Sequence, residues 1–173
     1  MRVLGIDPGA SGALAFLTIS AGLPVGLETL DMPVLRIGKR TQIDSYALAR
    51  EIDARVLSPG EDGEPLACAM LEQGGVRPQN GRVGAATFWL GIGVIRGVLA
   101  AHFIPTEIAA SSTWKRSLRV TGDKNASRAR ASAIFPRWAD QWSRVKDEGR
   151  AEAALIALYG ANQLPVLEAR QSA

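Results

Sequence analysis

The stretch "VLGIDPGASGALAFL", residues 3–17, sets an acid at the end of an apolar run and follows it directly with Pro8-Gly9. Pro fixes φ and Gly tolerates positive φ, so the pattern predicts a strand, a tight turn and a second strand. The turn explains Pro8 and Gly9 by backbone preference alone. Asp7, held at the strand end, could in addition bind a metal ion, and these residues alone leave both interpretations open.

The whole chain has 173 residues, of which 47% are apolar, enough for one domain over 1–173 with a real core. The most apolar run, residues 85–101, contains Arg96 and three glycines and falls short of the roughly 18 residues that span a bilayer. The first strand contains an acid, so no signal peptide is expected. We therefore expect a cytoplasmic protein with no membrane partner.

Cysteine and histidine are too scarce for several common kinds of site. Cys68 is the only cysteine, which excludes an internal disulfide framework. His102 is the only histidine, which argues against the usual zinc sites and His-based triads. Any chemistry must rest on carboxylates, amines, hydroxyls or a carboxylate-bound metal.

Basic residues gather in one segment. Residues 113–150 hold ten Lys or Arg against four Asp or Glu, although the chain as a whole carries only +3. Such a concentration in a protein of pI 9.4 suggests a polyanionic partner, while a solvated helical face would look similar.

Hydrophobic periodicity and Gly/Pro punctuation divide the chain into short elements. Strands are expected at 2–6, 12–19, 26–32, 66–71 and 103–109. Helices are expected at 43–57, 85–102, 113–120, 124–135 and 146–159, the second mostly buried and the last ended by Gly160. Residues 33–42 and 73–84 are expected to be loops. This order predicts an α/β fold with a mixed sheet flanked by helices.

Further acids stand where they could join Asp7. Glu72 follows the apolar run 66–71, and Asp147, Glu148 and Glu152 lie at the start of the last helix. Glu148 and Glu152 are four residues apart, so they share a helix face and repel each other unless a cation lies between them. For Asp147, interaction with the helix dipole is a sufficient explanation.

Carboxylates drawn from strand ends and a helix are the ligands that Mg²⁺ or Mn²⁺ prefers. Two such ions about 4 Å apart could activate a water and stabilise the leaving oxygen of a phosphodiester. The sequence alone does not show that these acids converge.

Four blocks, "GIDPGASGALA", "MLEQ", "TWKRSLRVTGDKNASRARASAIFP" and "KDEGRAEAALIA", occur in the order and approximate spacing of RuvC-like Holliday-junction resolvases. The chain resembles their phage and prophage branch over residues 2–160, which leaves a short C-terminal tail. The resemblance implies a ribonuclease H-like fold with a five-stranded sheet, a homodimer, and Mg²⁺-dependent symmetric nicking of four-way DNA junctions in recombination and repair.

The resemblance also implies the metal ligands. Asp7 matches the first-strand aspartate, Glu72 the glutamate of the "EQ" pair, and Glu152 the acid of the last helix. The family's fourth acid stands three or four positions before that last acid. Gly149 occupies the nearer position, so we expect Glu148 as the fourth ligand, with Asp147 as the alternative.

DNA contacts are expected from the basic block and from the segment after Glu72. The predicted set is Arg77, Arg82, Lys115, Arg116, Lys124 and Arg128. Lys124 is expected to contact a phosphate or the transition state as well. The family's aromatic residue after the "EQ" pair is missing, so either Phe88 or Trp89 takes its place or the junction is opened differently.

Two alternatives to a nuclease remain open at this point. A protein of the same fold could bind branched DNA without cutting it, although the presence of all the acids argues against this. An actin-like nucleotide-binding protein also opens with "GIDPG", but 173 residues cannot supply the two lobes that enclose ATP.

Overall fold

The computed structural model describes residues 1–38, 40–56, 65–75, 81–121 and 125–171. A five-stranded sheet has the order β3-β2-β1-β6-β7. Strands β1 (Arg2–Asp7), β2 (Ala13–Ser20) and β3 (Leu23–Asp31) form an antiparallel meander. Strands β6 (Leu66–Gln73) and β7 (Thr106–Ala110) continue the sheet in parallel with β1. The expected mixed α/β sheet is confirmed.

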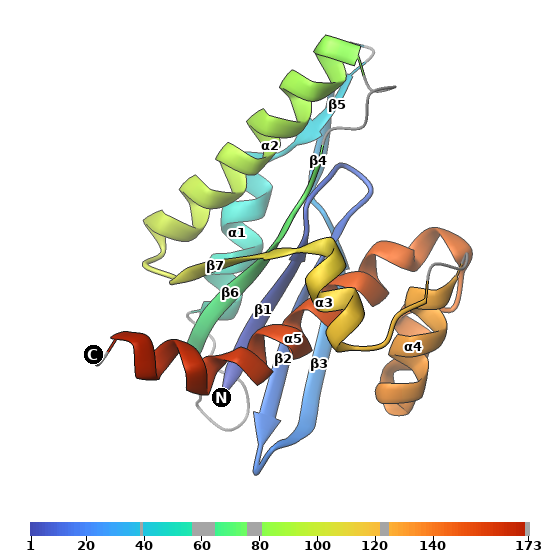
Figure 1. Ribbon diagram of the computed structural model, residues 1–173. Helices are drawn as coiled ribbons and strands as arrows, with labels where there is room; N and C mark the ends of the chain where they lie inside the picture. The colour runs from blue at the N-terminus through green and yellow to red at the C-terminus, as the bar shows by residue number, and fades with distance from the viewer. Residues whose placement is uncertain (39, 57–64, 76–80, 122–124, 172–173) are drawn as a thin grey trace.

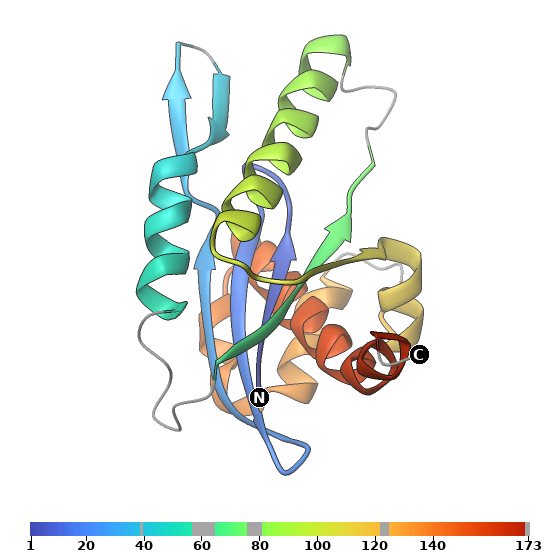
Figure 2. The ribbon, with the colours of Figure 1, turned by 90° about the vertical axis from the view of Figure 1, so that its left-hand side faces the viewer.

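Helices cover both faces of the sheet (Figures 1 and 2). One face packs against α1 (Ser45–Val56) and α2 (Gly81–Ala101), and the other against α4 (Ala126–Ile134) and α5 (Glu148–Gln171). The short α3 (Ser111–Ser117) follows β7 directly, and two 3₁₀ segments, Pro136–Trp142 and Val145–Asp147, lead from α4 into α5. Asp44 caps α1, because its Oδ1 accepts hydrogen bonds at 3.0 Å from the backbone N–H groups of Tyr46 and Ala47.

The alternation of side chains along the strands decides which face receives the acids. In β1, Leu4 and Ile6 belong to the core beneath α1 and α2, whereas Val3 belongs to the core beneath α5. Asp7 has the same parity as Val3, so its side chain projects on the α5 face. Glu72 likewise shares the parity of Met70, which packs in the α5 core. Both strand-end acids therefore face the last helix.

The prediction of a polar loop at residues 33–42 was wrong. This segment contains the antiparallel pair β4 (Val34–Ile37) and β5 (Arg40–Ile43), a small second sheet. Gly38 has φ of +62°, which suits a hairpin connection. Val34 and Ile37 are exposed, so the hairpin has no complete hydrophobic face that the sequence pattern could have revealed.

A helix was correctly expected at residues 85–102, but the prediction that it is mostly buried was wrong. In α2 only Gly91, Ile95 and Leu99 are buried, while Val83, Trp89 and Leu90 are more than half exposed. Among the described residues, α2 is the helix whose length and hydropathy would suffice to cross a membrane. Those two properties alone are weak grounds for a membrane span.

Gly160 does not end the last helix, as the sequence had suggested. Helix α5 runs through it to Gln171, so the expected C-terminal tail is largely helical. A Cβ at Gly160 would lie 2.9 Å from the Cβ of Met70 and 3.2 Å from a methyl of Val3. The glycine is needed for close packing of α5 on the sheet rather than for a C-cap.

Candidate metal centre

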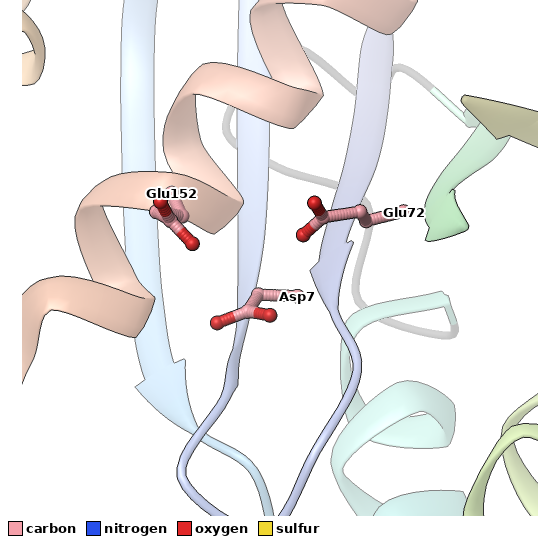
Figure 3. Close-up of side chains that lie close together, drawn as sticks. All are labelled: Asp7, Glu72 and Glu152. Carbon is pink, nitrogen blue, oxygen red and sulfur yellow. The ribbon is translucent and has the colours of Figure 1, made fainter. Parts of the chain in front are cut away.

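Three of the predicted acids meet at one end of the sheet (Figure 3). Asp7 ends β1, Glu72 lies near the end of the neighbouring parallel strand β6, and Glu152 projects from the first turns of α5. One carboxylate oxygen from each lies within 4.8 Å of those from the other two. Hard divalent cations take carboxylate oxygens at such spacings, so the three side chains fit a Mg²⁺ or Mn²⁺ ion.

Two glycines allow α5 to approach closely enough for this convergence. A Cβ at Gly5 would lie 2.1 Å from the carbonyl oxygen of Ala153 and 2.4 Å from the backbone nitrogen of Ala157, so the helix backbone rests directly on β1. A Cβ at Gly149 would lie 2.8 Å from the carbonyl oxygen of Ser11 and 3.1 Å from Oδ2 of Asp7. These contacts set Glu152 beside Asp7.

The cluster is electrostatically strained in the absence of a cation. Burial, reinforced by the negative charges of Glu152 and Glu72, raises the pKa of Asp7 well above its ordinary value. Burial also raises the pKa of Glu72, and a hydrogen bond from Ser111 partly offsets that effect. Two neighbouring acids that resist ionisation are the arrangement that a bound divalent cation would relieve.

Two side chains hold the third acid. The Nζ of Lys115 on α3 lies 2.8 Å from Oε1 of Glu152, and the Oγ of Ser127 on α4 donates to the same oxygen at 2.8 Å. Burial alone would lower the pKa of Lys115, but the hydrogen bond to Glu152 and the surrounding carboxylates raise it. Lys115 is therefore a charged member of the centre.

A cavity of about 560 Å³ opens onto the three acids. Lys115, Ser111 and Phe88 contribute to its wall, together with the backbone-rich segment Gly74-Gly75. The centre is thus reachable from outside through a largely polar opening.

Comparison with known proteins gives a consistent answer at the level of the fold. RuvC of Thermus thermophilus, solved in complex with a Holliday junction substrate, is 17% identical, with a TM-score of 0.60 and 96% of each chain covered. A second T. thermophilus RuvC structure has a TM-score of 0.61 at 19% identity, again with 96% of each chain covered. The fowlpox virus Holliday junction resolvase is 13% identical, with a TM-score of 0.53, 95% of this chain and 99% of that chain covered. No protein-family model and no curated protein matches the chain.

The chain has a RuvC-like resolvase fold. Its mixed five-stranded sheet flanked by helices matches the ribonuclease H-like fold of RuvC, which the resemblance had implied. The acids converge at the end of the two central parallel strands of this RuvC-like sheet, where ligand sites of α/β proteins gather.

Among the described residues, no fourth acid lies in the cluster formed by the other three. Glu148 is exposed at the first position of α5 and does not belong to the cluster, although it is near enough to raise the pKa of Asp7 slightly. Asp147 is buried and accepts two hydrogen bonds from the guanidinium of Arg144, at 2.8 and 2.9 Å. Gly149 stands where the family's acid is expected, with no room for a side chain against Ser11 and Asp7.

The predicted DNA-binding residues lie in different surroundings. Arg77 and Lys124 lie outside the described residues. Lys115 lies in the metal centre itself, Arg116 is exposed beside it on α3, and Arg82 is exposed in the first turn of α2. Arg128 donates from Nη1 to the carbonyl of Ser143 at 3.2 Å, which ties α4 to the segment before α5.

The two candidate aromatics differ in position. Phe88 lines the cavity above the acids, whereas Trp89 is half exposed on another side of α2 and meets Phe88 edge-on. Of the two, Phe88 is therefore the one placed at the opening of the metal centre.

Sequence reasoning did not find Ser111 and Ser127, and it assigned Lys115 to phosphate contact rather than to the acids. Ser127 is 25 residues from Glu152, so no local pattern connects them. The role of Ser111 follows from where α3 lies relative to Glu72 on β6, and that of Ser127 from how α4 packs on α5.

Proposed function

We propose that this protein is a metal-dependent endonuclease that resolves Holliday junctions and related branched DNA by paired nicks. The observation that carries the proposal is the convergence of Asp7, Glu72 and Glu152 within 4.8 Å at the sheet end of a RuvC-like fold. Mg²⁺ or Mn²⁺ bound there, one ion or two, would supply an activated water and stabilise the leaving oxygen of the phosphodiester. No covalent enzyme intermediate is needed.

The chain's own residues divide the remaining tasks. Asp7, Glu72 and Glu152 hold the metal, and Lys115 offsets their charge while its ammonium stays partly exposed to an incoming phosphate. Arg116 on α3 extends the positive charge outward, and Lys124 and Arg128 of the same basic segment would be further phosphate contacts. Glu148 remains a proposed outer ligand that could approach a second ion.

A homodimer is part of the proposal, because paired nicks in two strands require two active sites. Helix α2 offers a surface for it: Val83, Trp89 and Leu90 are large, apolar and more than half exposed. A twofold axis beside α2 would cover the same surface on both copies.

The test uses a synthetic four-way junction with wild-type protein and Asp7→Asn. Wild-type protein is expected to nick opposite strands in Mg²⁺ or Mn²⁺, and Asp7→Asn to bind the junction but lose at least about 10³-fold in nicking rate, since a neutral amide is a poor ligand. Sedimentation of the wild-type sample is expected to give twice the chain mass.

Two outcomes would contradict the proposal. Cleavage retained in Asp7→Asn would remove the metal centre from catalysis. Junction binding by wild-type protein, with no nicking in either metal, would identify a non-catalytic binder of branched DNA instead.

A further inference from the structure

The short helix α3, which leads from the end of β7 to the side of α5, turns one face toward the metal centre (Figure 1). Ser111, Trp114 and Lys115 have the spacing i, i+3 and i+4, so their side chains lie on the same side of the helix. The Ser111 hydroxyl donates to Glu72, and Lys115 pairs with Glu152. Two members of this face therefore already hold the acids.

Trp114, the third member, is completely buried. Its indole belongs to the core that lies between the sheet and α5. The Nζ of Lys115 lies 5.1 Å from the centroid of the Trp114 ring. An ammonium at this distance is attracted to the negative face of an indole. Trp114 therefore contacts the cation of the metal centre as well as the core.

The indole N–H of Trp114 is not used by the core. Within the part of the chain that the structure describes, Nε1 is buried and makes no hydrogen bond of normal geometry. Buried donors are nearly always paired, because leaving one unpaired costs free energy. Burial raises the pKa of the Glu72 carboxyl, and the Trp114 N–H lies near enough to oppose that rise, as the Ser111 hydroxyl does. The spare donor is thus directed at a proposed metal ligand.

Trp142 in the same core shows the arrangement of a tryptophan that only packs. Its side chain is equally buried, and its Nε1 donates to the Oγ of Ser132 at 3.0 Å. No polar atom of Trp142 is left over. Packing alone therefore explains Trp142, whereas it would leave the N–H of Trp114 without an acceptor.

We propose that Trp114 is a positioning residue of the metal centre, and that its indole N–H holds the Glu72 carboxylate in the orientation that binds a divalent cation. The inference rests on the proposed function. The two oxygens of a carboxylate offer several acceptor sites, so Glu72 can accept from Trp114 and Ser111 and still bind a metal ion. Donors that hold a ligand in this way raise its affinity for the metal.

The experiment measures metal affinity without DNA, by calorimetric titration of Mn²⁺ into metal-free protein. Trp114→Phe removes the N–H and keeps an aromatic ring in the core. Trp142→Phe is the matched control, because it makes the same substitution in the same core at a tryptophan that bonds Ser132 instead. Ser111→Ala removes the other donor to Glu72 and gives the reference for the size of the effect. Urea unfolding of each metal-free variant measures stability.

Trp114→Phe should weaken Mn²⁺ binding about tenfold, as should Ser111→Ala, since losses of about 10–100-fold are typical of such partners. Trp142→Phe should bind Mn²⁺ as wild-type protein does. The order for stability should be the reverse. Trp142→Phe breaks a formed hydrogen bond, so its urea midpoint should lie below that of Trp114→Phe. Two residues that only pack would not give opposite orders in the two measurements.

The proposal is overturned if Trp114→Phe binds Mn²⁺ as tightly as wild-type protein, or if both tryptophan variants lose affinity in proportion to their loss of stability. A Trp114→Phe protein that fails to fold while Trp142→Phe folds would also overturn it, because the N–H would then serve folding rather than metal binding. Failure of the proposed nuclease is a separate result. Wild-type protein would then bind Mn²⁺ without nicking a four-way junction, and the Mn²⁺ affinity of Trp114→Phe would still decide the role of Trp114.

Discussion

Phe88 separates two regions that are built in different ways. On one side, close backbone packing at Gly5 and Gly149 positions the three carboxylates. Lys115 and Ser127 beside them both bind Glu152, by an ion pair and a hydrogen bond. On the other side, a hollow of about 310 Å³ lies between the β4–β5 hairpin and α2, which carry exposed apolar and cationic side chains. The first region is held by backbone contacts, which suits a site whose ligands must be fixed, whereas a Cβ at Gly91 in the second region would meet only the side chain of Ile43.

The largest effect is expected when a methyl group is added to the glycine of β1 on which α5 rests. Gly5→Ala would drive Cβ into the backbone of α5, 2.1 Å from the carbonyl oxygen of Ala153, so β1 and α5 must separate. We expect a loss of about 3 kcal/mol or more in the free energy of unfolding, at the upper end of overpacking effects. Urea unfolding measures it.

The matched control is Gly93→Ala on α2, where a Cβ meets nothing within 4 Å. Alanine is favoured over glycine in a helix interior, so this change should stabilise the protein by about 0.5–1 kcal/mol. Equal effects of the two substitutions would show that α5 does not rest on β1 as closely as described.

The sequence predicted the acid side of the molecule well and missed the hairpin side. The acids were predictable because Asp7 and Glu72 each end an apolar strand, and strand alternation then puts both on one face. The hairpin was missed because its strands have four residues each and expose Val34 and Ile37, so they show no hydrophobic face. Periodicity reports burial, and it cannot reveal an element that is only partly buried.

Other differences arose from contacts between distant segments. Gly160 looked like a helix end, but its role is set by Met70 and Val3 on the sheet. The sequence left open whether the apolar face of α2 is buried in the core or exposed to a second copy of the chain, since an apolar helix looks the same in both cases.

The second prediction concerns the acid side of the pH profile of nicking. Burial raises the pKa of both Asp7 and Glu72, and their ionised forms are the ones that bind metal. As pH falls through these raised values, protons displace the metal, so the rate should fall about tenfold per pH unit for each proton taken up. The decline should begin above the ordinary carboxylate range of about 4.

Raising the Mg²⁺ concentration should move this decline to lower pH, because metal and protons compete for the same oxygens. A raised pKa in the folded state also means that acidification relieves the metal-free cluster, so Asp7→Asn should be more stable than wild-type protein without metal at neutral pH. Each kcal/mol gained would raise Tm by about 2–4 °C for a chain of this size. A decline centred near pH 4 and insensitive to Mg²⁺ would contradict the coupled cluster.

The smallest effect is expected from Ser127, which positions a ligand without touching the metal or the DNA. Its hydroxyl donates to Oε1 of Glu152 from a buried position on α4. Ser127→Ala should raise the Mg²⁺ concentration needed for half-maximal nicking about tenfold, in line with the 10–100-fold typical of such partners, because Glu152 is then held by Lys115 alone. Ser127→Thr keeps the hydroxyl and should restore much of the metal affinity, whereas the alanine variant at saturating Mg²⁺ should approach the wild-type rate. A purely structural role for Ser127 would instead lower the amount of folded protein and leave the metal dependence unchanged, so the metal titration separates the two roles.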